Sequence, residues 1–151
     1  MKSPVLVLIP MLLALAAGAV LPFQAVLNGQ LRGLLGSPFA AALVSFSAGT
    51  LLLLAIVLLL RTPWPANVAA VPWYLWVAGG TLGVGYLIMS IWLPPMLGVA
   101  LTFGLIVAGQ LAMSLALDHF GWLGVAQHAI NPWRVLGAAL IVAGVILIRK
   151  F

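Results

Sequence analysis

Five apolar stretches, each long enough to cross a lipid bilayer, constrain the fold of this chain more than any other feature. A membrane-spanning helix needs about 20 apolar residues, with a range of roughly 17–25. The stretches that meet this requirement cover residues 5–27, 38–60, 73–93, 97–118 and 133–148. The sequence therefore predicts an all-α integral membrane protein, with residues 1–151 forming a single transmembrane domain of five helices.

The composition excludes several other classes of protein. Of the 151 residues, 66% are hydrophobic and 5% are charged, whereas a soluble domain is roughly 45–50% apolar and about 25% charged. The net charge of +5 comes from scattered basic residues, so no patch for nucleic acid is expected. Cysteine is absent, and with it any disulfide framework or thiolate site. Since the chain also lacks a phosphate loop, a triad and paired carboxylates, we expect neither an enzyme nor a cofactor.

Proline and glycine mark where the predicted helices begin and end. Gly36-Ser37-Pro38 closes the first connection and places proline in the first turn of the next helix. Pro94-Pro95 predicts a tight hairpin, and Asn131-Pro132 predicts an N-cap followed by proline at the first helical position. All six tryptophans fall at predicted helix ends or in loops, where interfacial aromatic belts lie: Trp64, Trp73, Trp76, Trp92, Trp122 and Trp133.

The N-terminal stretch permits a second interpretation. Lys2, an apolar run and the small residues 17–19 resemble a cleavable signal peptide. The apolar run continues to Leu27, however, and Pro22 fits a kinked helix. We therefore expect a first membrane-spanning helix that contains Pro10 and Pro22.

Small residues at every fourth position indicate how the helices pack, because association in lipid depends on close approach of the backbones. The rows are 104-108-112-116, 41-45-49, 79-83, 14-18 and the pair 137-144. Packing within one bundle explains most of them. We expect some rows to contact a partner chain, since five short helices leave little room for a private central cavity.

The few polar residues within spans are the candidates for a binding site, because such groups usually face the protein interior or a water-filled path. Gln24 and Asn28 are spaced i to i+4 and share a face, with a helix-end hydrogen-bond network as the alternative. Tyr86 and Ser90 lie on the same side as Gly83, with a packed tyrosine as the alternative. These four residues are predicted substrate contacts.

The fourth span adds Gln110 and Ser114 to the predicted substrate contacts. Gln110 sits near the middle of its span, where an unpaired amide costs several kcal/mol in hydrocarbon. We expect it to meet another helix or a ligand.

Asp118, the only acidic residue in the chain, is followed by His119 and precedes His128 and Arg134 in the next connection. One interpretation is an interfacial ion pair with Arg134. The other is a coupling or gating role for Asp118 and His119, which can exchange protons. Their spacing matches no specific metal-ligand pattern, so no metal site is predicted.

Several sequence runs together resemble the YdcZ family, a small branch of the drug/metabolite transporter (DMT) superfamily. The runs are LPFQAVLNGQL at 21–31, GSP at 36–38, SFSAGT at 45–50, AGQL at 108–111, DHFGWLG at 118–124 and RVLG at 134–137. The resemblance implies a five-helix unit equal to half of a ten-helix DMT-type transporter built from two inverted repeats, with the site near the bilayer midplane. The related small multidrug resistance branch carries a glutamate in its first helix. This chain has Gln24 and Asn28 there, so that exchange mechanism does not carry over.

The sequence thus predicts a multi-pass transporter subunit of the bacterial inner membrane. It would move a small organic, cationic or amphipathic solute by alternating access, as an antiparallel homodimer or with a homologous inverted partner. With five spans, Lys2, Arg61 and Arg134 fall on one side and Arg32, Arg149 and Lys150 on the other. This balance gives no preferred orientation, since lysine and arginine counts set topology. The alternatives are a small ion channel and a non-transporting membrane scaffold.

Overall fold

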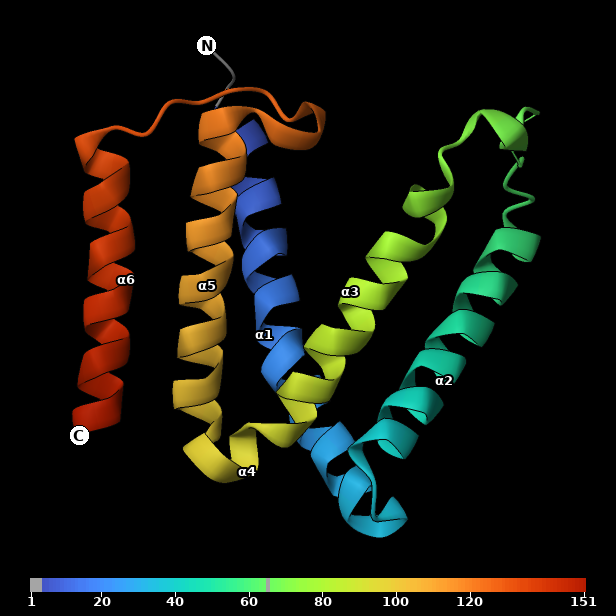
Figure 1. The fold of residues 1–151 in the computed structure, drawn as a ribbon, viewed down its shortest axis with the longest axis horizontal. Coiled ribbons are helices and arrows are strands. Elements are labelled where there is room, and N and C mark those ends of the chain that lie inside the picture. The colour runs from blue at the N-terminus through green and yellow to red at the C-terminus, as the bar shows by residue number, and fades with distance from the viewer. Residues whose placement is uncertain (1–3, 65) are drawn as a thin grey trace. The chain divides into compact units, whose positions relative to one another are not determined.

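The structure, a computed structural model, describes residues 4–64 and 66–151, with side chains from residue 8 onward. Lys2, counted above, lies outside the described residues. All regular elements in the described part of the chain are helical, and Figure 1 shows their order. The longer helices are α1 (Pro4–Leu35), α2 (Pro38–Leu59), α3 (Trp73–Trp92), α5 (Val99–Phe120) and α6 (Pro132–Lys150). The short ones are α4 (Pro94–Leu97) and the 3₁₀ helices η1 (Val68–Ala70) and η2 (Trp122–Gly124).

Within residues 4–64 and 66–151, five helical segments are long and apolar enough to cross a membrane: Leu8–Leu35, Pro38–Leu59, Trp73–Leu97, Val99–Phe120 and Pro132–Lys150. The third combines α3 with the single turn of α4. The predicted all-α membrane fold with five spans is confirmed.

Two helix starts are built as the sequence indicated. The side chain of Ser37 accepts a hydrogen bond from the backbone amide of Ala40, and Pro38 occupies the first turn of α2. Asn131 Oδ1 accepts from the backbone amide of Arg134 at 2.9 Å, ahead of α6. In both cases a polar cap pairs an amide that the first helical turn leaves free.

Helix α1 continues beyond Leu27, where the sequence placed its end, to Leu35. It contains Pro10 and Pro22. The helix stops only at Gly36, whose φ of +72° is a conformation that glycine adopts without a Cβ penalty. The Gly36 amide donates to the Arg32 carbonyl at 2.8 Å, which caps the last turn.

The connection around residue 94 also differs from the expected hairpin. Pro94 and Pro95 begin the single helical turn α4, because proline suits the first positions of a helix. This turn ends at Gly98, which has a φ of +84° and donates its amide to the Pro94 carbonyl at 2.8 Å.

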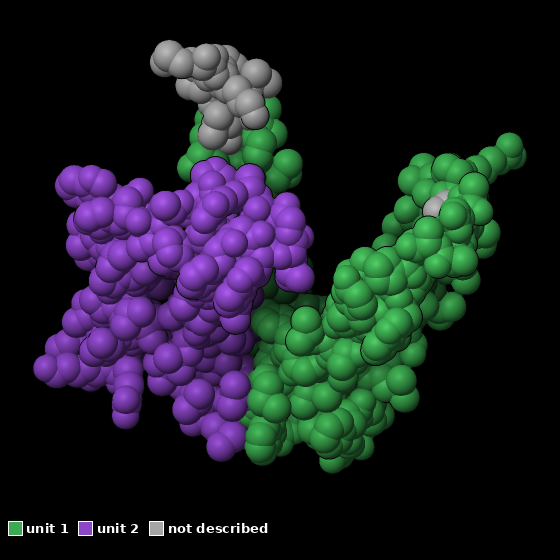
Figure 2. Space-filling model, turned by 45° about the horizontal axis from the view of Figure 1, so that its top comes forward, with its two compact units in different colours: residues 1–92 green, residues 93–151 purple. Residues whose placement is uncertain are grey.

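The chain contains two compact units, residues 1–92 and residues 93–151, drawn in different colours in Figure 2. In the first unit α1, α2 and α3 pack on one another. Its core consists of Ala41, Ala42, Leu87 and Ile91, with Leu31 and Ile88 packed against them. Within this unit α3 runs back alongside α2 after the connection that joins them (Figure 1). That the whole chain forms one domain stays a prediction.

In the second unit α5 packs against α6. The two helices lie close together at Gly104, where a Cβ would lie 3.0 Å from Cγ2 of Val145. Val145 is buried, with 7% of its surface exposed. Gly104 therefore lets α6 come nearer than a larger residue at this position of α5 would allow.

Candidate functional site

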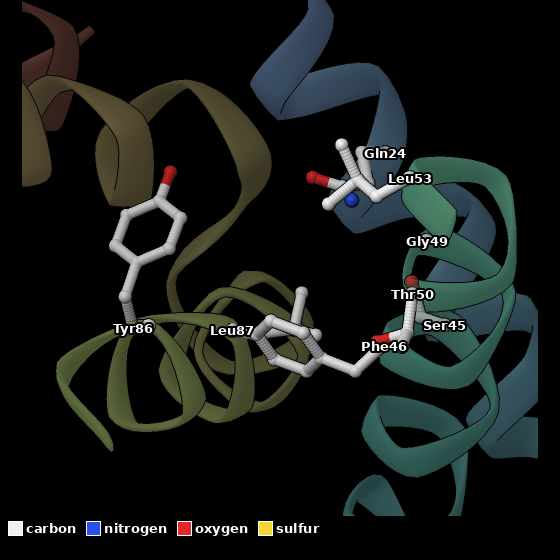
Figure 3. A pocket seen from close by; sticks show the side chains of 9 residues that line it. Gln24, Ser45, Phe46, Gly49, Thr50, Leu53, Tyr86 and Leu87 are labelled. Atoms are coloured by element: carbon white, nitrogen blue, oxygen red, sulfur yellow. The ribbon is translucent and has the colours of Figure 1, made fainter. Parts of the chain in front are cut away.

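A cavity of about 340 Å³, called here the polar cavity, lies among α1, α2 and α3 within the first unit. This volume is near the lower end of the range for small-molecule sites, roughly 300–1,000 Å³. Its lining residues are Gln24 from α1, Ser45, Phe46, Gly49, Thr50 and Leu53 from α2, and Gly83, Tyr86 and Leu87 from α3. Figure 3 shows these side chains.

Four residues with polar side chains, from three helices, line the polar cavity: Gln24, Ser45, Thr50 and Tyr86, of which the Tyr86 hydroxyl is itself buried. Gln24 and Tyr86 were predicted as substrate contacts, and the structure brings them to the same cavity. All four lie on segments long and apolar enough to cross a membrane. A polar lining within membrane-spanning segments is costly unless water or a ligand pairs it.

Small residues create the space for this cavity. Gly83 lies under the ring of Phe46, and a Cβ on Gly83 would be 3.6 Å from Cζ of that ring. A Cβ on Gly49 would meet no atom within 4 Å. Any larger side chain at these two positions would take up part of the space between α2 and α3.

Asn28 and Ser90 are buried, with 6% and 2% of their surfaces exposed, and they do not line the polar cavity. The Ser90 hydroxyl donates to the Leu87 carbonyl of its own helix at 2.8 Å. Asn28 Nδ2 has no hydrogen-bond partner within residues 4–64 and 66–151, and neither has the buried hydroxyl of Tyr86. An unpaired buried donor costs about 1–3 kcal/mol.

Gln110 and Ser114 lie on α5, in the second unit, and both are exposed. Within the described part of the chain, neither side chain forms a hydrogen bond. Exposed amide and hydroxyl groups on a membrane-spanning helix are free to meet another molecule.

Asp118, at the end of α5, forms an ion pair with Arg134 in the first turn of α6. The two side chains are 28% and 30% exposed, respectively. Arg134 also donates through Nη1 to the His128 carbonyl at 2.8 Å. The His128 amide in turn donates to the Asp118 carbonyl at 2.7 Å. The ion pair that the sequence allowed is thus present and is part of a network that fixes the connection between α5 and α6.

His119 takes part in the same connection. Its Nδ1 accepts a hydrogen bond from the backbone amide of Ile130 at 3.2 Å, and its carbonyl accepts from Gln127 Nε2 at 2.8 Å. Since a backbone amide can only donate, Nδ1 of His119 must carry no proton in this arrangement. His119 therefore holds the loop against the end of α5.

Sequence reasoning did not nominate Ser45, Phe46 and Thr50. Ser45 was assigned to a row of packing residues, and Thr50 belongs to the SFSAGT run quoted for the family resemblance. The signal that could have identified them is the close spacing of Ser45, Phe46 and Thr50 on one stretch of α2. Nothing in the sequence alone shows that this stretch faces Gln24.

No group of three His, Cys, Asp or Glu side chains that could hold a metal ion is found among the described residues. Five apolar helices with a polar cavity between three of them are the features of a membrane transporter.

The comparison with protein families agrees with this class. A family model described as "Putative inner membrane exporter, YdcZ" matches residues 9–147. The chain therefore belongs to the YdcZ family and is a multi-pass protein of the inner membrane. No curated protein and no solved structure matches it.

Proposed function

We propose that this YdcZ-family protein carries a small organic solute across the inner membrane and binds it in the polar cavity. One observation carries the proposal: the amide of Gln24, the hydroxyl residues Ser45 and Thr50, and Tyr86 line one cavity among three apolar helices. Polar groups in membrane spans are rare and are kept where they face a path for polar molecules.

The chemistry of the cavity indicates the solute class. Among the residues that the structure describes, no charged side chain lines it, so a solute would be held by amide and hydroxyl oxygens and by aromatic faces. Tyr86 offers a ring on which an organic cation gains about 0.5–2 kcal/mol. The apolar walls formed by Leu53 and Leu87 suit the hydrocarbon part of an amphipathic molecule.

We further propose that two oppositely inserted copies form the carrier and alternate between inward-facing and outward-facing states. The equal lysine and arginine counts on the two sides, described above, support insertion in both orientations. Several glycines of the predicted packing rows have free space where a partner helix would fit. A Cβ on Gly18, Gly79, Gly137 or Gly144 would meet no atom within 4 Å.

The remaining predicted site residues keep their proposed roles. Gln110 and Ser114 carry side-chain polar groups free to contact the solute or a partner helix, and the unpaired Asn28 amide needs an acceptor. Asp118 and His119 are proposed to gate or couple transport through the network at the end of α5.

A ligand screen by thermal shift on purified protein tests the binding proposal, because a binder raises the unfolding temperature as its concentration exceeds Kd. Suitable probes are tetraphenylphosphonium and a panel of alkyl and aryl ammonium ions. In Gln24→Ala we expect affinity for a binding probe to fall about tenfold, which is ~1.4 kcal/mol. Gln30→Ala is the matched control, because Gln30 is an exposed glutamine of the same helix outside the cavity. Equal affinities in the two variants would contradict the site.

Flux through reconstituted vesicles separates this carrier from the two rival classes. A carrier shows saturable flux, a channel shows single-channel conductance, and a scaffold shows neither.

The proposed dual topology has its own test. Because the chain has no cysteine, one cysteine introduced at position 2 or 151 can be labelled in intact cells with a membrane-impermeant reagent. About half labelling at both positions is expected from two orientations. Full labelling at one end with none at the other would show a single orientation.

A further inference from the structure

A second hollow lies on the same pair of helices as the polar cavity. This apolar groove, of about 290 Å³, is lined by Phe39, Ala42, Leu43 and Phe46 of α2 and by Val84 and Ile88 of α3. Each of these six side chains is a hydrocarbon. The groove therefore offers no side-chain hydrogen bond and suits apolar groups.

Helix α3 presents different faces to the two hollows. Gly83 and Leu87, four residues apart, line the polar cavity. Val84 and Ile88, also four residues apart, line the apolar groove. Since residues at i and i+4 share a helix face, the two hollows lie on adjacent faces of α3.

Of the described residues, Phe46 alone lines both hollows. It reaches from α2 toward α3, where its ring lies near Leu87 in Figure 3. Cζ of the ring would be 3.6 Å from a Cβ on Gly83, and 39% of the residue is exposed. The ring therefore stands at the boundary between a polar compartment and an apolar one.

We infer that Phe46 is a specificity-determining residue that divides an amphipathic site into two parts. The polar head of the solute occupies the polar cavity. One hydrocarbon substituent of the solute, called here its apolar arm, passes the Phe46 ring into the apolar groove. This inference rests on the proposed function and deepens it, because it assigns a place to each end of the solute.

The geometry explains how the ring can admit an arm. Phenylalanine changes position by rotating about two side-chain bonds between staggered states. Gly83 has no side chain to obstruct the ring on the α3 side. The size of residue 46 should therefore set which arms can pass from one compartment to the other.

Cysteine labelling tests the division without any knowledge of the natural solute. Ser45 lines the polar cavity next to Phe46, and Ser45→Cys exchanges one oxygen for sulfur in a chain without other cysteines. Purified Ser45→Cys protein is reacted with N-ethylmaleimide and with N-octylmaleimide. The quantity measured is the rate of reaction with N-octylmaleimide divided by the rate of reaction with N-ethylmaleimide. Each variant's ratio is compared with that of the parent, which carries Phe46. This comparison cancels the effect of reagent partition into the detergent.

We expect Phe46→Ala to raise this ratio about tenfold, equivalent to ~1.4 kcal/mol, and Phe46→Leu to raise it less. Phe39→Ala is the control, because Phe39 lines the groove but not the polar cavity. It should leave the ratio unchanged. In the Phe46→Leu background Leu43→Trp should lower the ratio again by filling the groove.

An unchanged ratio in both Phe46 variants would overturn the inference, as would an equal rise in Phe39→Ala. Phe46→Leu retains an apolar side chain and keeps the test valid if Phe46→Ala does not fold. The labelling ratio needs no transport, so a failed ligand screen together with the expected ratios would refute the proposed function and leave the divided site intact.

Discussion

The contact between Gly104 and Val145 gives a sharp prediction about how α5 and α6 are held together. In Gly104→Ala the new methyl carbon would lie 3.0 Å from Cγ2 and 3.6 Å from Cγ1 of Val145. Apolar carbons pack best at about 3.5–4.0 Å, so the helices must separate by roughly half an ångström. Val145 cannot easily rotate away, because a β-branched side chain in a helix has one strongly preferred rotamer.

Overpacking of this kind typically costs about 1–3 kcal/mol. Alanine is also a better helix former than glycine by about 1 kcal/mol in water, and this gain must be separated from the packing loss. Gly109→Ala provides the correction, because Gly109 lies on the same helix and a Cβ there meets no atom within 4 Å. We expect Gly104→Ala to be less stable than Gly109→Ala by about 1–3 kcal/mol.

The measurement is equilibrium unfolding in mixed micelles, followed by the fluorescence of the tryptophans. In the double variant Gly104→Ala/Val145→Ala the alanine methyl no longer meets the two Cγ atoms, so the penalty of the first substitution should nearly disappear. A cycle of the two single variants and the double variant isolates this coupling. The reasoning is refuted if Gly104→Ala matches Gly109→Ala in stability, or if its penalty is the same with and without Val145.

Further predictions concern three polar residues. Asp118→Asn removes the ion pair with Arg134, and we expect it to lower the free energy of unfolding by at most about 1 kcal/mol, because both side chains are partly exposed. The same variant should abolish any pH dependence of solute flux in vesicles, whereas an unchanged pH profile would exclude Asp118 from coupling. Tyr86→Phe removes a buried hydroxyl that has no partner in the described part of the chain. It should leave the ligand-free protein equally stable or up to about 1 kcal/mol more stable in micelle unfolding, and a clear loss of stability would show that the hydroxyl is paired. Gln110→Ala alters an exposed side chain, so we expect unfolding to change by less than about 0.5 kcal/mol while probe affinity falls. Retained affinity with poor expression would make Gln110 a structural residue.

The membrane spans could be predicted because hydropathy alone selects them, and the caps at Ser37 and Asn131 because they depend on neighbouring residues only. The end of α1 could not be predicted in this way. The polar run after Leu27 is typical of a loop, yet no residue before Gly36 has a positive φ in the described chain. The helix therefore continues through residues that are polar but compatible with helical backbone.

The site was partly predictable for a related reason. Gln24 and Tyr86 stood out as large polar groups within apolar spans. Hydroxyls were a poorer guide: Ser90 and Ser114 were predicted as contacts while Ser45 and Thr50 were not, because serine and threonine in helices often bond a carbonyl of their own helix. Thr81, Ser90 and Thr102 do so here, with distances of 2.7–2.8 Å.

The hydroxyls of Ser45 and Thr50 line the polar cavity instead. Which hydroxyl turns to its own helix and which faces a cavity depends on how α2 is rotated against α1 and α3. That rotation is set by packing around Ala41 and Leu87, residues distant in sequence. The rotation of α2 against α1 and α3 therefore cannot be predicted from a single sequence.

Protection of one introduced cysteine by a bound solute tests most directly whether the polar cavity is the binding site. Thr50→Cys places the thiol on the cavity wall, and Ser47→Cys places it on an exposed position of α2 outside the cavity. Labelling is measured with and without tetraphenylphosphonium, or with whichever ammonium probe binds in the thermal-shift screen. At about ten times Kd the probe should slow labelling of Thr50→Cys about tenfold and leave Ser47→Cys unchanged. Equal rates with and without bound probe in Thr50→Cys, or equal protection of both positions, would contradict the assignment.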